Sequence, residues 1–424
     1  MYFCSLKIII NTIYMSNKNL MVVNCVIFLA LIMPACNQIK KESIEEKAAR
    51  IHDKVLTVDS HVDTPMRLTH SGFDIGKSHS VDDERSRVDF PRMKEGGLDA
   101  VFFAIFTGQG ERTTEGNEKA RKYAFQISDS IHSKLEKYSD IAQIALTPED
   151  AYNAEKLGKR AIFIGLENGY PIGNDISLIK SYYDLGVRYI TLCHTRNNDI
   201  CDSSTDTTEY NGLSEFGVEV VEEMNSRGMM IDVSHISDSS FYDVIKISSS
   251  PIIASHSCAR AICDNPRNLT DDMLISLAKN NGVIQLCILS DYIKEPDPNP
   301  KRDSCQQVVR EKYRHFRDLT NEEMDSARIE WYAIDTIFPA KYANVADAVD
   351  HIDHIVKLIG IEHIGIGTDF DGGGGLEDCE DVSQLGNITL ELVKRGYSEA
   401  EIEKIWGGNI MRVMNEVANN ATKN

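Results

Sequence analysis

The sequence contains no pair of cysteines separated by two residues, which argues against a zinc site built from cysteines. It also lacks a basic patch, since 45 Lys and Arg stand against 65 Asp and Glu, for a formal net charge of -20. This charge would repel polyanions, so nucleic acid is not an expected partner. No internal repeat or low-complexity run interrupts a composition of 42% hydrophobic and 26% charged residues, which is typical of a globular protein with a large core.

Acidic residues are absent from the first 36 positions, where Lys7 and Lys18 precede the apolar run MVVNCVIFLALIMPAC. This pattern is typical of a bacterial secretion signal. Because Pro34 and Ala35 precede Cys36, we predict a lipoprotein signal peptide over residues 1–36, with a lipid on Cys36 that anchors the exported protein to the cell-envelope membrane. A plain signal peptide or a single membrane anchor is the alternative, and Met15 or Met21 is an alternative start. Seven cysteines follow Cys36, an odd number that leaves at least one unpaired within a chain.

Apolar β-rich runs alternate with amphipathic helical stretches through most of the remaining chain. Such alternation predicts a parallel sheet whose outer face is covered by helices. We expect strands at VLTVDSHVD from Val55, LDAVFFAIF from Leu98, RAIFIGLE from Arg160, VRYITLCH from Val187, MMIDVSH from Met229, PIIASH from Pro251, GVIQLCIL from Gly282 and HIGIGTDF from His363. Eight strands indicate a TIM-like (β/α)8 barrel of the metal-dependent hydrolase type. A doubly wound open sheet is the alternative.

The expected boundaries follow from this pattern. Residues 37–54 form a polar, helix-prone tether, and residues 55–417 form a single barrel domain that ends in a helix from Ser398 to Val417. A long segment at about 291–345, between the seventh and eighth strands, is predicted to be an insertion with helices of its own. Residues 418–424 are expected to be a frayed tail.

Potential metal ligands stand at the ends of most of these strands, where a barrel places its active site. His61 and Asp63 lie two residues apart on one strand end, so their side chains point the same way. Glu167 needs a positive partner if it is buried, and by bridging two ions it could complete one site with His61 and Asp63 and a second with His235 and His256. Imidazole and carboxylate ligands suit zinc, and cobalt or manganese could occupy the same set.

Two ions about 4 Å apart would lower the pKa of a bridging water, whose hydroxide would attack a carbonyl. Asp369, in GTDFDGG, could take the proton of this water and pass it to a leaving amine. Asp371 is the competing candidate, but it falls in the turn after the strand. A second His-x-Asp pattern at His351, with the neighbouring His354, lies in an amphipathic helix and is interpreted as surface or helix packing.

These motifs together resemble the renal or membrane dipeptidase family of zinc enzymes, over about Val55 to Val417. The resemblance is carried by DSHVD, GLENG, DVSHIS, SHSCAR followed by NPRNLTDD, and GIGTDFDG, in this order. It implies a dipeptidase with two zinc ions per subunit bridged by Glu167, and a homodimer. It also implies that His194 orients the substrate carbonyl, that Asp369 handles protons and that Arg267 binds the terminal carboxylate of a dipeptide.

Two departures from the family pattern bear on the substrate. Asn168 follows the bridging glutamate where many members have Gly, and Arg260 follows SHSCA where mammalian members carry an aromatic residue. Both could line the substrate pocket, and members of the family often accept a D-residue at the C-terminal position. Two other functions stay open: a related amidohydrolase that acts on N-acyl amino acids or other amides, and a non-catalytic peptide-binding surface lipoprotein.

Overall fold

The computed structural model describes residues 42–81, 86–316, 319, 321–339 and 341–421. The predicted signal peptide, Cys36 and the first part of the predicted tether lie outside these residues. Within the described ranges, no helix combines the length and the apolar character needed to span a membrane.

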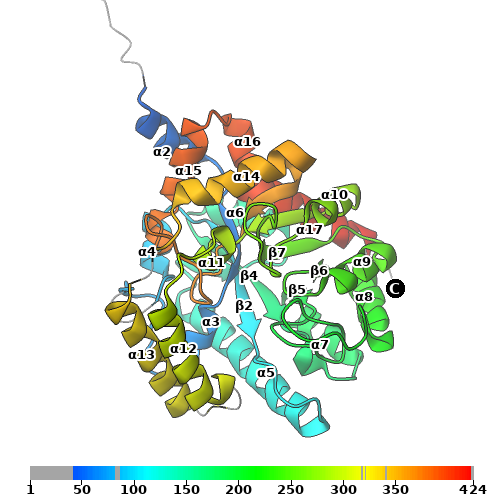
Figure 1. The fold of residues 1–424 in the computed structure, drawn as a ribbon. Helices are drawn as coiled ribbons and strands as arrows, with labels where there is room; N and C mark the ends of the chain where they lie inside the picture. The colour runs from blue at the N-terminus through cyan, green and yellow to red at the C-terminus, as the bar shows by residue number, and fades with distance from the viewer. Residues whose placement is uncertain (1–41, 82–85, 317–318, 320, 340, 422–424) are drawn as a thin grey trace, which may run out of the picture. The chain divides into compact units, whose positions relative to one another are not determined.

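Eight parallel strands surround the core in the order β1-β2-β4-β5-β6-β7-β8-β9, which confirms the predicted barrel (Figure 1). All pair in parallel with their neighbours, and the short strand β3 adds to β4 outside this path. The strands are β1 (Val58–Val62), β2 (Ala100–Phe106), β3 (Ala142–Ile144), β4 (Arg160–Glu167), β5 (Val187–Thr191), β6 (Met230–Asp232), β7 (Ile253–Ser257), β8 (Val283–Leu286) and β9 (Ile364–Ile366).

The barrel closes between its first and last strands just beyond the end of β9. Asp63 donates its backbone N–H to the carbonyl of Phe370 at 2.8 Å, and Asp369 donates to the carbonyl of His61 at 3.0 Å. An open doubly wound sheet has two free edges and no such bonds, so that alternative is wrong. The closing bonds also bring Asp63 and Asp369 together at the carboxyl ends of the strands.

Alternate residues of the strands fill two different cores, as the two-residue period of a strand requires. Phe102 and Phe163 point into the barrel, where their rings stack with centroids 4.6 Å apart. Val101 and Ile162 point outward into the layer between strands and helices. Because both faces are buried, the strands are apolar throughout, as the sequence showed.

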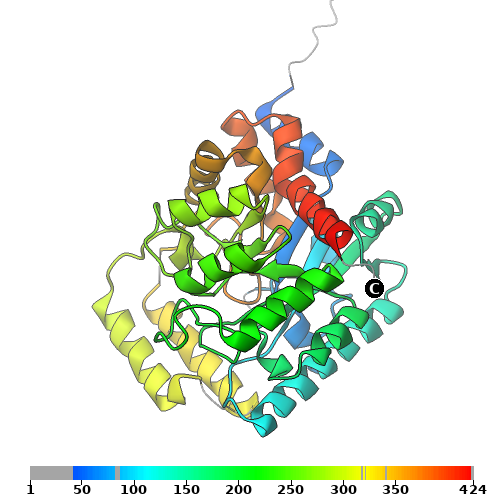
Figure 2. The ribbon, with the colours of Figure 1, turned by 90° about the vertical axis from the view of Figure 1, so that its right-hand side faces the viewer.

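Helices cover the outside of the barrel (Figures 1 and 2). The α-helices of the described residues are α2 (Ile44–Lys54), α3 (Pro65–Leu68), α4 (Phe90–Glu95), α5 (Thr114–Lys137), α6 (Pro148–Lys156), α7 (Ser177–Asp184), α8 (Glu215–Arg227), α9 (Asp238–Ile247), α10 (Asp271–Lys279), α11 (Ser290–Ile293), α12 (Pro300–Lys312), α13 (Asn321–Ile337), α14 (Val345–Ile359), α15 (Gly386–Lys394), α16 (Glu399–Glu403) and α17 (Asn409–Asn420). The predicted closing helix is interrupted by a π-helical turn, Lys404–Gly408, and continues to Asn420, so residues 418–420 are helical and not a frayed tail.

Residues 44–54 form a docked helix, so the predicted tether is wrong for this part. Ile51 of α2 is fully buried, and His52 lies between Thr389 and the carbonyl of Gly96, at 2.7 and 2.8 Å from its two ring nitrogens. The same imidazole packs edge-on against Trp406, with ring centroids 5.2 Å apart. The charged residues of this helix face outward. Their number in the sequence is the reason why the segment was predicted to be a tether.

Replacing Ile51 with Ala is therefore expected to lower the free energy of unfolding by about 2–5 kcal/mol, because a buried methyl-rich side chain is lost. Ile44, on the same helix, is 50% exposed and serves as the control. Its replacement with Ala should change stability by less than about 0.5 kcal/mol. Denaturant unfolding of the two variants measures the difference, and equal effects would show that α2 does not dock.

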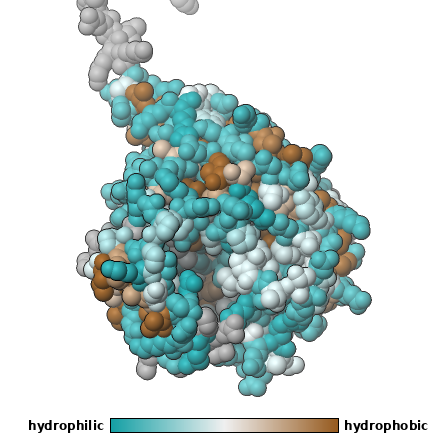
Figure 3. Space-filling view, viewed as in Figure 1, coloured by the Kyte–Doolittle hydropathy of each residue, from teal (hydrophilic) through white to brown (hydrophobic). Residues whose placement is uncertain are grey.

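The predicted insertion is a helical hairpin of α12 and α13 with a small core of its own, built on Val309, Tyr313, Ala327 and Ile334. Its outer surface leaves Val308, Ile329 and Ile337 more than 60% exposed. Figure 3 shows apolar surface over this hairpin, among other apolar patches on a largely hydrophilic face, with a hollow beside it. The hairpin stands apart from the barrel core and contributes none of the candidate ligands described below.

Candidate metal centre

The structure brings all the predicted metal ligands together at the carboxyl ends of the strands. Three groups of side chains have potential ligand atoms within 4.8 Å of one another, and every member is buried. The groups are His61, Asp63 and Glu167; Glu167, His235 and His256; and His61, His256 and Asp369. The first two are the two sites expected from the sequence.

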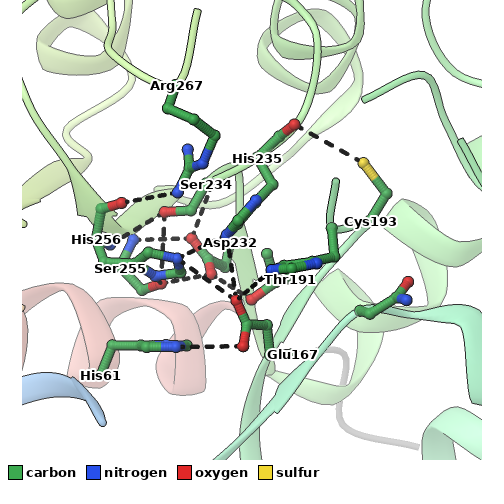
Figure 4. Close-up of polar contacts among 12 residues, drawn as sticks. His61, Glu167, Thr191, Cys193, Asp232, Ser234, His235, Ser255, His256 and Arg267 are labelled. Carbon is green, nitrogen blue, oxygen red and sulfur yellow. Dashed lines mark hydrogen bonds and ion pairs between the residues drawn. The ribbon is translucent and has the colours of Figure 1, made fainter. Parts of the chain in front are cut away.

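Glu167 lies between the two groups, with its carboxylate oxygens facing in different directions (Figure 4). Oε2 is 3.5 Å from Nε2 of His61, whereas Oε1 is 3.2 Å from Nε2 of His235 and 3.5 Å from Nε2 of His256. Since β4 ends at Glu167, the strand itself delivers this side chain to the mouth of the barrel. One carboxylate therefore serves both groups.

Several donor atoms of these groups have no hydrogen-bond partner among the described residues. They are Nε2 of His61, Oδ1 of Asp63 and Oε2 of Glu167, one from each member of the first group. Buried polar atoms are rarely left unpaired in a native protein, because the loss of hydration is costly. Two nitrogens that each lie about 2.0–2.1 Å from a zinc ion can be at most about 4.2 Å apart. Nε2 of His235 and Nε2 of His256 are 2.9 Å apart, so the residues present fit a divalent ion.

Burial without a bound cation shifts these groups toward their neutral forms. Desolvation raises the pKa of Glu167 to about 8 and raises that of Asp63 well above its ordinary value. Desolvation likewise lowers the pKa of His235 and of His256 well below the ordinary value. A cation favours the ionised carboxylate and the neutral imidazole, which are the forms that bind metal. The site therefore has the buried carboxylates and imidazoles of a cation site, and the charge of Arg267 offsets the burial of Glu167 only in part.

Three residues at these strand ends adopt the left-handed backbone conformation, which non-glycine residues seldom use. Asn168 has φ 73°, His235 has φ 71° and Asp369 has φ 60°. The carbonyl of Asp369 accepts backbone N–H groups from Gly372, Gly373 and Gly374, so the glycines of GTDFDGG wrap this turn. At each of these three residues the backbone therefore leaves the regular strand direction and turns at the mouth of the barrel.

Hydroxyl groups hold the second nitrogen of two ligand rings. Nδ1 of His61 is 2.8 Å from the hydroxyl of Tyr189, and Nδ1 of His256 is 2.8 Å from that of Ser255. Ser255 in turn donates to Asp232, a buried carboxylate on β6. Neither Tyr189 nor Asp232 was predicted from the sequence to support a ligand. A signal for Asp232 existed, because a carboxylate inside the apolar run MMIDVSH needs a partner.

His194 lies at the edge of the centre, with its side chain 22% exposed and Nε2 3.7 Å from Oε1 of Glu167. Its ring contacts Phe106 edge-on and lies against His235, with ring centroids 4.7 and 4.2 Å away. Burial and the charge of Arg267 lower the pKa of His194 to about 3. A neutral imidazole at this position can donate one N–H toward a bound molecule.

The two candidate aspartates have different surroundings. Asp369 faces the centre, and burial together with the charge of Asp63 raises its pKa well above the ordinary value. Asp371 instead accepts hydrogen bonds from Thr64 at 2.7 Å and from the backbone N–H of Arg87 at 2.8 Å. Asp371 therefore holds the turn together, whereas Asp369 is available for chemistry.

Arg267 reaches the centre from the loop after β7, with 4% of its surface exposed. Its Nη2 donates a hydrogen bond to the carbonyl of His256 at 3.2 Å (Figure 4). The guanidinium also lies over the ring of Tyr292, 5.2 Å from the ring centroid. Its Nε has no partner among the described residues. A buried guanidinium with an unused donor beside the ligands is suited to bind an anionic group of a substrate.

The two departures from the family pattern have structural roles. Asn168 is fully buried, donates to the carbonyl of Thr107 at 3.0 Å and accepts the backbone N–H of Tyr170 at 3.1 Å. Its side chain therefore supports the turn and does not line a pocket. Arg260 forms a bidentate pair with Asp238, with both distances 2.7 Å.

The second His-x-Asp pattern lies in α14 and makes packing contacts, as predicted, and none of its residues belongs to the three groups of candidate ligands. His351 accepts the backbone N–H of Ala259 and contacts the carbonyl of Ile293, and His354 pairs with Asp271. All seven cysteines among the described residues are free thiols. Neither feature adds to the group of candidate ligands.

Comparison with known proteins places these features in a family. The profile described as membrane dipeptidase, peptidase family M19, matches residues 45–424. Dipeptidase verJ from Clonostachys rogersoniana is 31% identical over 385 residues, 88% of this chain and 86% of that protein. Among solved structures, the probable dipeptidase PvdM from Pseudomonas aeruginosa is 29% identical with a TM-score of 0.78, covering 89% of this chain and 99% of that one. A Rhodobacter sphaeroides metallopeptidase, solved with a phosphinate mimic of L-Ala-D-Ala, shares the fold at 21% identity and a TM-score of 0.69, covering 86% of this chain and 99% of that one.

Proposed function

The chain belongs to the membrane dipeptidase family, peptidase family M19, and we propose that it hydrolyses dipeptides with two zinc ions held at the mouth of its barrel. One ion would be bound by His61, Asp63 and Glu167, and the other by Glu167, His235 and His256. The single observation that carries this assignment is the position of Glu167, whose two oxygens face two different sets of buried ligands.

Hydrolysis of a dipeptide adds the hydroxyl of water to the peptide carbon, breaks the C–N bond and delivers a proton to the leaving amine. Two bound ions would supply a water of lowered pKa and an electrophile for the carbonyl oxygen. Asp369 lies beside His61 and His256, and its raised pKa suits a carboxyl group that takes up a proton and then gives it to the leaving amine. His194, neutral and partly exposed, would donate an N–H to the carbonyl oxygen as negative charge develops there.

Arg267 would fix the other end of the substrate by binding its terminal carboxylate. The guanidinium fork matches a carboxylate in geometry, and burial makes the pairing stronger than it would be at the surface. Binding of the carboxylate at Arg267 and of the peptide carbonyl near Glu167 would direct cleavage to the last peptide bond of the substrate, which lies one residue from the terminal carboxylate.

Further details of the proposal rest on the ligand chemistry and on the sequence. Zinc is the proposed metal because the ligands mix imidazole and carboxylate. A D-residue at the C-terminal position is proposed as acceptable, and the dipeptide mimic bound by the Rhodobacter sphaeroides enzyme, which ends in D-Ala, supports this. Export to the cell envelope and a lipid on Cys36 are proposed from the sequence pattern of residues 1–36 alone.

The decisive experiment measures amino-acid release from L-L and L-D dipeptides, from their C-terminal amides and from one N-acylated amino acid. We expect zinc-dependent cleavage of the free acids that exceeds cleavage of the amides by about 100-fold, since losing one partner of a buried charge pair costs about 2–5 kcal/mol. Replacing Arg267 with Met should bring the two rates to within about threefold of each other for the same reason. Arg260→Met is the matched control, because Arg260 pairs with Asp238, and it should keep the wild-type preference.

Other outcomes would lead to other assignments. Cleavage of the N-acylated compound alone would identify an acylase. Dipeptide binding without turnover by the zinc-loaded protein would identify a peptide-binding protein. A preference for free acids that survives in Arg267→Met would remove Arg267 from the substrate site.

A further inference from the structure

Asp232 is a fully buried carboxylate at the end of β6, one layer beneath the metal centre. It accepts hydrogen bonds from the hydroxyls of Thr191 at 2.5 Å and Ser255 at 2.6 Å, both on Oδ2. Oδ1 accepts the backbone N–H groups of Ser234 at 3.0 Å and Ser255 at 2.8 Å. Figure 4 shows these bonds converging on Asp232 from β5 and from the two segments that carry the candidate ligands His235 and His256.

The direction of each hydrogen bond follows from the donors available. The single hydroxyl proton of Ser255 goes to Oδ2 of Asp232 at 2.6 Å, since its other acceptor, Oγ of Ser234, lies farther away at 3.4 Å. Oγ of Ser255 is also 2.8 Å from Nδ1 of His256, and with its own proton committed it can only accept there. His256 must therefore carry its proton on Nδ1. The lone pair of Nε2 is then directed at the group formed with Glu167 and His235.

We propose that Asp232 is a positioning residue for one of the two metal ions and acts through the hydroxyl of Ser255, which holds His256 in the tautomer and orientation that bind metal. This inference rests on the two-metal site of the proposed function. A carboxylate behind a ligating histidine fixes the ring and increases its basicity, and loss of such a partner typically lowers metal affinity by about 10–100-fold. Asp232 touches neither metal nor substrate in this role.

His61 is held by a similar device that lacks a charged group. Nδ1 of His61 contacts the hydroxyl of Tyr189, and that hydroxyl donates to the backbone carbonyl of Ser60 at 3.1 Å. The relay behind His61 is therefore neutral, whereas the relay behind His256 ends on a carboxylate. The two ions should consequently differ in their dependence on the residues beneath them.

A second buried aspartate shows what a purely structural carboxylate looks like in this barrel. Asp59 accepts the hydroxyl of Thr368 at 2.5 Å and the backbone N–H groups of Thr368 and His61 at 2.9 and 3.1 Å. Asp59 thus links the last strand to the first. Among the described residues, the hydroxyl that it bonds contacts no ring of a candidate ligand. Of these two aspartates, only Asp232 is connected through a hydroxyl to such an imidazole.

The two serines of the Ser-His motifs provide a matched pair of variants. Ser234 and Ser255 are both fully buried and both precede a candidate ligand. Oγ of Ser234 accepts the backbone N–H of His256 at 3.0 Å, whereas Oγ of Ser255 contacts the imidazole. Replacing either with Ala removes one buried hydroxyl, and only Ser255→Ala cuts the relay.

The experiment uses cobalt, which can occupy the same ligands as zinc, and measures the affinity of metal-free protein for each of two cobalt ions by competition with a chelator. The melting temperature of each metal-free variant is measured alongside. Ser255→Ala should lower the affinity for one ion by about 10-fold or more and Ser234→Ala by less than about twofold, while their melting temperatures fall by similar amounts. In Asp232→Asn the new amide can donate to Ser255, so that the serine hydroxyl turns to Nδ1 and His256 takes the wrong tautomer. The affinity for the same ion should then fall by about 100-fold.

Equal affinity losses in the two serine variants, or unchanged affinity in Asp232→Asn, would overturn the positioning role. Loss of both ions in equal measure would do so as well, because the relay reaches only one ligand. Failure of the wild-type protein to bind two ions would instead contradict the proposed function. The melting temperatures separate these results from simple unfolding.

Discussion

Glu167→Gln is expected to release both metal ions and to lower kcat for dipeptides by about 10⁴-fold, or about 5 kcal/mol of transition-state stabilisation. The amide keeps the shape of the side chain but has one acceptor oxygen where the carboxylate has two. Its NH2 group would exclude the ion on the side it faces, at His61 or at His235 and His256, and its neutral oxygen is a weaker ligand than a carboxylate for the ion on the other side. Metal analysis of the purified variant and single-turnover kinetics measure the two effects.

Stability provides the control for this variant. Without metal, burial raises the pKa of Glu167 to about 8, so the wild-type side chain is already mostly neutral at pH 7. The metal-free Gln variant should therefore melt at the same temperature as the metal-free wild type or slightly above it, and only the wild type should gain stability when zinc is added. A variant that still binds two ions per chain would show that Glu167 does not bridge them.

Asp369→Asn is expected to lower kcat by about 10³-fold while leaving the metal content at the wild-type value, because general acid–base catalysis typically contributes 10²–10⁴-fold. The amide fits the same space but cannot carry a proton from the attacking water to the leaving amine. Because Asp369 also lies near His61 and His256, it could instead be a metal ligand. Metal analysis separates the two roles, since loss of an ion from Asp369→Asn would identify a ligand.

Asp371→Asn is the matched control for this prediction. Asp371 lies two residues away and is also buried, but it is bonded to Thr64 and to the backbone of Arg87. Its replacement should lower the melting temperature and leave kcat within about threefold of wild type, because no proton transfer is lost. If kcat fell as much as in Asp369→Asn, activity would depend on the conformation of the whole turn and not on the carboxylate of Asp369 alone.

The barrel and the polar residues that meet at its mouth could be predicted because they rely on local patterns. Strands buried on both faces must be apolar, so the polar residues that end them, such as His61 and Glu167, stand out in the sequence. Their meeting at one end of the barrel then follows from the parallel arrangement. Tyr189 and Asp232 could not be paired with their histidines in this way, since the contacts join different strands and depend on register.

The helix before the first strand was misassigned for a different reason. Ile44, Ala48 and Ile51 have the spacing of an amphipathic helix, but the charged residues around them resemble a linker. What decides its position is the contact of His52 with Thr389 and Trp406, which lie more than 300 positions away in the sequence. Composition alone cannot reveal such a distant docking site.

The left-handed turns at His235 and Asp369 also bear on how this enzyme could change over generations. A non-glycine residue in that conformation costs about 1 kcal/mol or more, so the fold gives up stability at two positions to aim two side chains. Glycine at either position would relieve the strain and remove a functional group at once. Variants selected only for a higher melting temperature of the metal-free protein should therefore accumulate inactivating changes at His235 and Asp369. Selection for a more stable enzyme consequently has to be made in the presence of metal and substrate.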